Sequence, residues 1–170
     1  MSQINATNSL SQIMADIDLG PTGSLQFMFA KLQMAQSQIC KNEAESYMKQ
    51  IETIQEEQAE TAEMIELARK LQNEAKSDDK CTDMPPEMVK FFEQRGLSWE
   101  ETGGDKSHNA DEWDYNLKSL TNYQEQIGNK TQTLMIYLQD FIGQYNSYQE
   151  GAMSAISSAT QTLRSIAKGQ

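Results

Sequence analysis

The sequence contains few of the residues that interrupt helices or cross-link chains. Its 170 residues include three prolines, nine glycines, two cysteines and one histidine. Two cysteines exclude a disulfide framework, although a single bridge between Cys40 and Cys81 stays possible. No apolar run reaches the roughly 18 residues that a membrane-spanning helix requires, so we predict no direct membrane span.

Positive charge is also scarce. The chain has 25 acidic residues against 14 lysines and arginines, which gives a formal net charge of −11. Nucleic acids and anionic membranes are bound by clustered lysine and arginine, so we predict that neither is a partner. Charge of either sign is sparse towards the C-terminus. Between Ile127 and Gln170 the charged residues are Lys130, Asp140, Glu150, Arg164 and Lys168.

The sequence lacks a recognisable catalytic or metal-binding pattern. The single histidine, His108, lies in a stretch rich in Gly, Ser and Asn, where we expect a solvent-exposed loop. A cysteine–histidine pair with Cys40 or Cys81 is conceivable but has no supporting motif. The acidic residues near position 80 lack the alternating ligands and central glycine of a calcium loop. We therefore predict no catalytic, cofactor-binding or metal site, and no enzymatic activity.

What the sequence does have is a long apolar repeat near its C-terminal end. Apolar residues recur at alternating steps of three and four between Leu117 and Ile166, with few interruptions. This spacing predicts one long helix with a seam that other helices must cover. A coiled coil exposed to water usually carries Glu and Lys beside its seam, whereas this one carries Ser, Thr, Gln, Asn, Tyr and Met. We interpret the helix as buried on more than one side, within an assembly.

Breaks in composition divide the chain into four segments. Residues 1–23 are rich in Ser, Asn, Gln and Thr without a basic start, so we predict a flexible segment and no cleaved signal peptide. The alternative interpretation of this segment is an uncleaved export signal. We predict a first long coiled-coil helix over 24–76. A linker follows over 77–110, with a proline-initiated short helix at 85–95 and a loop. We predict a second long coiled-coil helix over 111–170.

These segments predict an all-α fold without strands. Its core is a long antiparallel helical hairpin, a coiled coil with the short helix and the loop inserted between the two long helices. Apolar side chains on more than one face predict that copies assemble into a helical filament. Around Phe27 and Phe29 the competing interpretation is that the cluster closes the end of the hairpin core. The predicted self-assembly or partner surface consists of Leu25, Phe27, Met28, Phe29, Leu32, Leu134, Ile136, Leu138, Phe141, Ile142, Tyr145, Tyr148, Ala152, Ala155, Ile156, Ala159, Leu163 and Ile166.

Three stretches also suggest a family. Residues 25–38 read LQFMFAKLQMAQSQ, residues 84–92 read MPPEMVKFF, and residues 145–169 read YNSYQEGAMSAISSATQTLRSIAKG. Together they resemble the hydrophilic translocator proteins of bacterial type III secretion systems. The EspA/SseB-like filament proteins resemble the chain most, and the IpaD-like needle-tip family comes second.

The resemblance implies a secreted virulence protein that forms an appendage on the bacterial cell surface. Its partners would be further copies of itself in a homopolymer, a cytoplasmic secretion chaperone, the needle subunit and the pore-forming translocators. Whether the chain would form the filament shaft or the needle tip stays open. The alternative function is a soluble intracellular coiled-coil adaptor or secretion chaperone, which predicts a compact dimer or tetramer at all concentrations.

Overall fold

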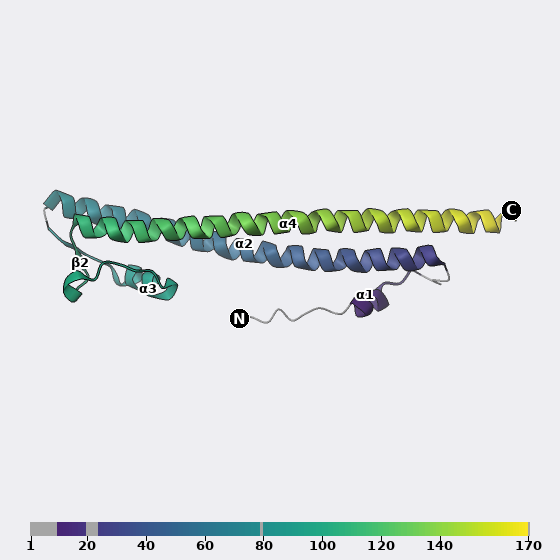
Figure 1. Cartoon of the computed structure of the whole chain (residues 1–170), viewed down its shortest axis with the longest axis horizontal. Coiled ribbons are helices and arrows are strands. Elements are labelled where there is room, and N and C mark those ends of the chain that lie inside the picture. The colour runs from purple at the N-terminus through teal and green to yellow at the C-terminus, as the bar shows by residue number, and fades with distance from the viewer. Residues whose placement is uncertain (1–9, 20–23, 79, 170) are drawn as a thin grey trace. The chain divides into compact units, whose positions relative to one another are not determined.

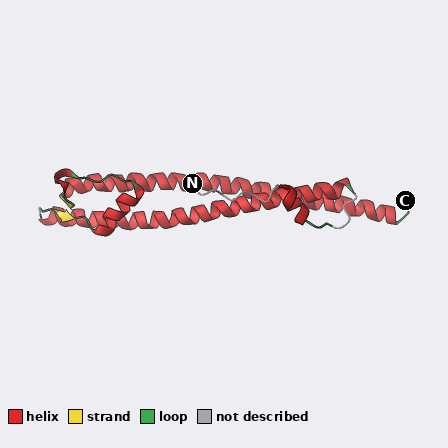
Figure 2. Cartoon of the chain, turned by 90° about the horizontal axis from the view of Figure 1, so that it is seen from below, coloured by secondary structure: helices red, strands yellow, loops and turns green. Residues whose placement is uncertain are grey.

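The computed structural model describes residues 10–19, 24–78 and 80–169, and helices dominate them (Figures 1 and 2). Two long helices run antiparallel with a short helix and a loop between them, so the predicted all-α hairpin is confirmed. The elements in chain order are α1 (Leu10–Asp16), α2 (Leu25–Asp78), β1 (Thr82–Asp83), α3 (Pro86–Arg95), the 3₁₀ turn η1 (Thr102–Gly104), β2 (Ser107–His108) and α4 (Ala110–Ala167).

The chain divides into two compact units, and each long helix contributes to both. Unit 1 comprises residues 1–50 and 134–170, and unit 2 comprises residues 51–133. We describe each unit by itself.

Unit 2 contains a conventional hydrophobic core. The helix α3 begins at Pro86, the first position of a helix, where a missing N–H costs nothing. It ends at Gly96, whose φ of 62° is the left-handed conformation that glycine adopts most readily. Between these limits α3 turns its large side chains towards α2 and α4. The buried core consists of Ile65, Ala68, Ala75, Met84, Met88, Val89, Phe91, Phe92, Trp113 and Leu120, with Leu97 and Trp99 packed against it.

Polar contacts fix α3 at the surface of this core. The Arg95 guanidinium lies 4.1 Å above the centre of the Phe91 ring and forms ion pairs with Glu57 and Glu60 of α2. Tyr123 of α4 donates a hydrogen bond to Glu57. Burial and this carboxylate together raise the pKa of Tyr123 to about 12, so the phenol stays protonated.

The linker is more ordered than the sequence indicates. The strands β1 and β2 pair antiparallel, with Thr82 opposite His108, although no strand was predicted. Two-residue strands are too short to produce the alternating pattern by which strands are recognised. The Trp113 indole N–H donates a hydrogen bond of 2.8 Å to Thr82, which ties the paired strands to the start of α4.

Unit 1 is a two-helix contact with small side chains at its centre. The pairs Ser37–Gln149, Cys40–Gln144 and Tyr47–Phe141 run in opposite directions along the chain, as antiparallel helices require. The helix α2 begins where the Ser24 hydroxyl accepts the N–H of Phe27 at 3.3 Å.

The helix α1 lies within the segment for which flexibility was predicted, and it buries Ile13. This helix was not predicted, although Leu10, Ile13 and Met14 have helical spacing, and the flexibility of the segment stays a prediction. Residues 1–9 and 20–23 of the predicted flexible segment lie outside the described residues.

Candidate self-assembly surface

Large apolar side chains lie on the outside of unit 1. Leu25 is 81% exposed, Met153 70% and Ile166 66%. Among the described residues, every exposed large apolar side chain except Tyr115 belongs to this unit. The others are Leu10, Met28, Phe29, Met48, Met135, Ile136, Tyr137, Ile142 and Leu163.

The interior of unit 1 explains why these side chains are outside. The residues buried where α2 meets α4 are mostly small: Ala30, Ala35, Ser37, Cys40, Ala44, Ala152, Ala155 and Ala159. Small side chains let two helix backbones approach closely, which leaves little room between them for large apolar side chains. The larger side chains therefore occupy the remaining faces of both helices, where nothing in the described chain covers them.

Polar groups are also built into the close contact. Gln149 donates a hydrogen bond of 2.9 Å to the buried Ser37 hydroxyl, and the Cys40 thiol lies 3.8 Å from Gln144. A Cβ atom added at Gly151 would lie 3.0 Å from the Gln33 side chain, which is closer than ordinary van der Waals contact. The intramolecular contact in unit 1 is therefore specified by small and polar residues rather than by a large apolar core.

The predicted surface divides into three groups. Seven of its members are exposed and available to another molecule: Leu25, Met28, Phe29, Ile136, Ile142, Leu163 and Ile166. Seven are partly covered: Phe27, Leu32, Leu138, Phe141, Tyr145, Tyr148 and Ile156. Phe141, for example, stacks on Tyr47 with ring centres 5.6 Å apart.

The third group is buried within the chain. Leu134, Ala152, Ala155 and Ala159 were predicted to contact other copies, but each is at most 9% exposed. In this structure they are not available to a second copy, because three of them are too small to reach beyond the close contact between α2 and α4. The apolar repeat predicts that another helix covers this side of α4. It does not show whether that helix belongs to the same chain or to another copy, because both kinds of contact have the same spacing.

Met48 was missed by the prediction, although it is 48% exposed and lies on unit 1. Met48 stands among Glu and Lys residues, so its local sequence resembles a solvated face. Helical spacing, which gives the face of α2 on which Met48 lies, is the sequence signal that could have identified it.

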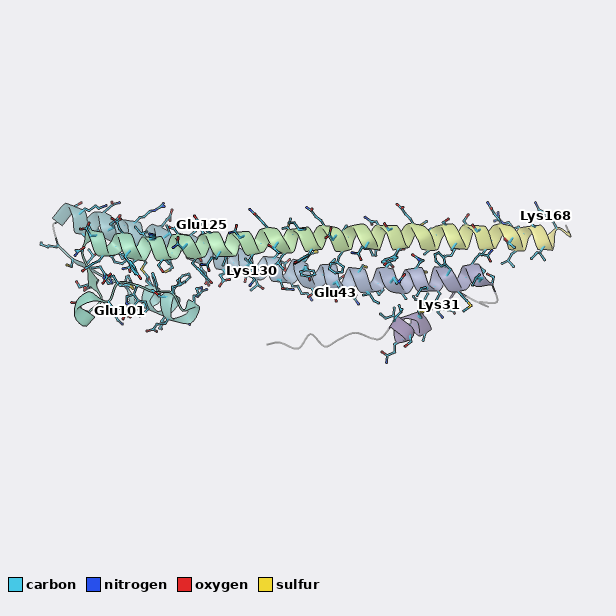
Figure 3. All side chains as sticks on the ribbon, viewed as in Figure 1. Lys31, Glu43, Glu101, Glu125, Lys130 and Lys168 are labelled. Atoms are coloured by element: carbon cyan, nitrogen blue, oxygen red, sulfur yellow. The ribbon has the colours of Figure 1, made fainter. Side chains whose placement is uncertain are left out.

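Few charges interrupt these faces on α4. The charged residues of unit 1 on this helix are Asp140, Glu150 and Arg164, and Lys168 follows directly after the C-terminal end of the helix (Figure 3). Desolvation of charged groups opposes close association, so a surface with few charges can be covered at little electrostatic cost.

The described residues offer little for other kinds of site. No group of three or more His, Cys, Asp or Glu side chains among them could hold a metal ion. Both cysteines are free, with Cys40 buried and Cys81 exposed, so the possible bridge is not formed. Burial raises the pKa of the Cys40 thiol, with a smaller contribution from Glu43. No helix in this part of the chain is long and apolar enough to cross a membrane.

The prediction that His108 lies in a solvent-exposed loop is wrong. His108 is 2% exposed and packs edge-on against Trp113, with ring centres 5.2 Å apart. Its burial follows from the β1–β2 pairing, which the sequence does not predict. The charged groups that act on its imidazole are the carboxylates of Glu112, Asp105, Glu100 and Asp83.

Comparison of the chain with protein-family models, with curated proteins and with solved structures found no match.

Proposed function

We propose that this chain is a structural, non-enzymatic subunit that self-assembles through the outer faces of unit 1. The observation that supports the proposal is the inverted distribution of side chains in that unit. Small residues fill its interior while Leu, Met, Ile and Phe side chains face outwards. Many exposed large apolar side chains on one unit of an otherwise polar chain are typical of a contact between proteins.

The resemblance of residues 25–38, 84–92 and 145–169 to type III secretion translocators supports the proposal that this assembly lies outside the cell. In this proposal the chain is a secreted subunit of a filament or needle-tip extension. It conducts or docks translocators and effectors, and a cytoplasmic chaperone covers its apolar faces before export. Apolar area removed from water stabilises such a contact by about 25 cal/mol per Å². A contact between different faces of neighbouring copies extends into a helical polymer.

Two exposed residues provide the test. Ile136→Asp and Met153→Asp each place a charge on the outer face of unit 1 without touching its small-residue interior. We expect both to reduce polymerisation at least about tenfold, since burying a carboxylate in an apolar contact is costly. Tyr115→Asp is the matched control, because Tyr115 is 47% exposed on unit 2.

Sedimentation velocity across a concentration series is the measurement. Polymers that form equally well in all three variants would contradict the proposal. A compact dimer or tetramer with the same mass at every concentration would favour the intracellular adaptor instead.

A further inference from the structure

Two short segments of the linker close on each other beside the start of α4. Residues 82–84 and 106–108 form this closure, which we call the clasp. Thr82 pairs with His108 across the two strands, and the Trp113 indole N–H of α4 donates its hydrogen bond to the Thr82 hydroxyl. Strands of two residues are held by few hydrogen bonds, so the clasp can open locally without unfolding of the long helices.

His108 is the buried titratable side chain of the clasp. It is 2% exposed, and its ring packs against Trp113 with ring centres 5.2 Å apart. Among the described residues, its Nε2 atom has no hydrogen-bond partner. A protonated imidazole carries N–H donors on both ring nitrogens, and each donor requires an acceptor when water is excluded. The closed clasp therefore accepts the neutral ring and disfavours the charged one.

The charged groups that act on the His108 imidazole are all acidic. Asp83 belongs to β1, Glu100 and Asp105 to the linker loop, and Glu112 to the first turn of α4. These carboxylates favour an imidazolium, but burial outweighs them in the closed clasp and lowers the pKa of the ring. A ring released into water loses the burial penalty and stays within the same acidic segments. The open clasp therefore binds a proton more tightly than the closed clasp.

We propose that the clasp is a pH-sensitive switch, which opens when a proton from the solvent binds to Nε2 of His108. Opening breaks the pairing of the two strands and the hydrogen bond between Trp113 and Thr82, and it releases the clasp from the start of α4. The switch lies in unit 2 and is independent of the proposed self-assembly through unit 1. It gives the chain a response to acid that requires no other protein and no ligand.

Contacts outside the clasp hold α3 in place when the clasp is open. Phe91 and Phe92 of α3 are buried in the core of unit 2, and Arg95 forms ion pairs with Glu57 and Glu60 of α2. None of these residues belongs to the clasp. Opening therefore exposes the clasp and the adjoining edge of the Trp113 ring to water, while the packing of α3 on α2 is kept.

Amide hydrogen exchange of the full-length chain, measured by NMR from pH 8 to pH 4.5, tests this switch. The Met84 N–H donates a hydrogen bond of 2.7 Å to the Lys106 carbonyl, so its exchange reports opening of the clasp. The Phe92 N–H lies in α3, so its exchange reports opening of the core. After correction for the intrinsic exchange rate at each pH, we expect the opening constant at Met84 to rise up to about tenfold from pH 7.5 to pH 5.5. We also expect it to stay at least about tenfold above the opening constant at Phe92.

The pH at which the rise begins identifies the titrating group. An imidazole in water titrates at about pH 6.5, whereas carboxylates titrate below about pH 5. The chain has one histidine, so a rise that begins at about pH 6.5 belongs to His108. The unmodified chain therefore tests the assignment whether or not a variant folds. His108→Phe is the matched variant, because its ring can keep the contact with Trp113 but cannot be protonated. We expect the opening constant at Met84 in this variant to change less than about twofold.

Other results would overturn the proposal. An opening constant at Met84 that is the same at pH 7.5 and pH 5.5 would show that the clasp does not respond to protonation. Equal opening constants at Met84 and Phe92 would show that the clasp opens only when unit 2 unfolds. A rise that persists in His108→Phe, or that begins only below about pH 5 in the unmodified chain, would assign the response to another group.

Discussion

His108 shows how the environment of one side chain determines its protonation. Its ring is buried against Trp113, and its Nε2 atom has no hydrogen-bond partner. Burial lowers the pKa of this imidazole, and the carboxylates of Glu112, Asp105, Glu100 and Asp83 oppose that shift without cancelling it. His108 is therefore neutral in the folded chain near neutral pH.

This burial predicts that acid destabilises unit 2. The folded pKa lies below the unfolded value of 6.5, so the unfolded chain binds the proton more readily between the two values. The contribution of His108 to stability is fully present above about pH 6.5 and decreases as the pH falls below it. Thermal unfolding at pH 7.5 and pH 5.5 is the measurement, and His108→Gln is the control.

We expect the melting temperature of the unmodified chain to fall more between these two pH values than that of His108→Gln. An equal change in both proteins would show that other groups cause the pH dependence.

At the scale of elements, α4 contains glycines in two different environments. A Cβ atom added at Gly143 would meet nothing within 4 Å, whereas one added at Gly151 would lie 3.0 Å from Gln33. Glycine in a helix interior costs about 0.5–1 kcal/mol relative to alanine. Glycine at position 143 therefore lowers the stability of the helix, and no close contact in the structure requires a glycine there.

Alanine substitutions at these two glycines should have different effects. We expect Gly143→Ala to raise the free energy of unfolding by about 0.5–1 kcal/mol. Gly151→Ala should gain clearly less, because Gln33 must move to accommodate the methyl group. Urea unfolding monitored by circular dichroism measures both. Equal stabilisation by the two substitutions would show that α2 does not approach α4 closely at Gly151.

The long helices are the elements that the sequence predicts well. Regular apolar spacing and the absence of proline place α2 and α4 to within three residues of their observed ends. Pro85–Pro86 and Gly96 likewise predict α3, because each has a specific role at a helix terminus. The β1–β2 pair was missed because its order comes from tertiary contacts, such as the Trp113–Thr82 hydrogen bond.

The candidate surface was harder to predict for a different reason. Helical spacing gives the side of a helix on which a residue lies, but not which neighbour covers that side. Ala155 and Leu134 were assigned to contacts between copies and lie in the intramolecular contact instead. Residue size was the missing signal, since small side chains favour the closest helix pair and leave large ones such as Met153 outside.

At the scale of the whole molecule, the two units differ in how they bury apolar surface. Unit 2 covers Phe91, Phe92 and Trp113 within one chain, whereas unit 1 leaves Leu25, Met153 and other large side chains exposed. This difference supports a division of roles. In the proposed function, unit 2 folds around its own core and further copies cover the outer faces of unit 1.

The most direct test of this account is the size distribution of the unmodified full-length protein as a function of concentration. Negative-stain electron microscopy and sedimentation velocity on the same samples give this distribution from micromolar concentrations upwards. The account predicts polymers whose length increases with concentration, since each added copy covers apolar surface that the last one leaves exposed. A monodisperse monomer at every concentration would contradict it, because the apolar faces of unit 1 would then be stable in water.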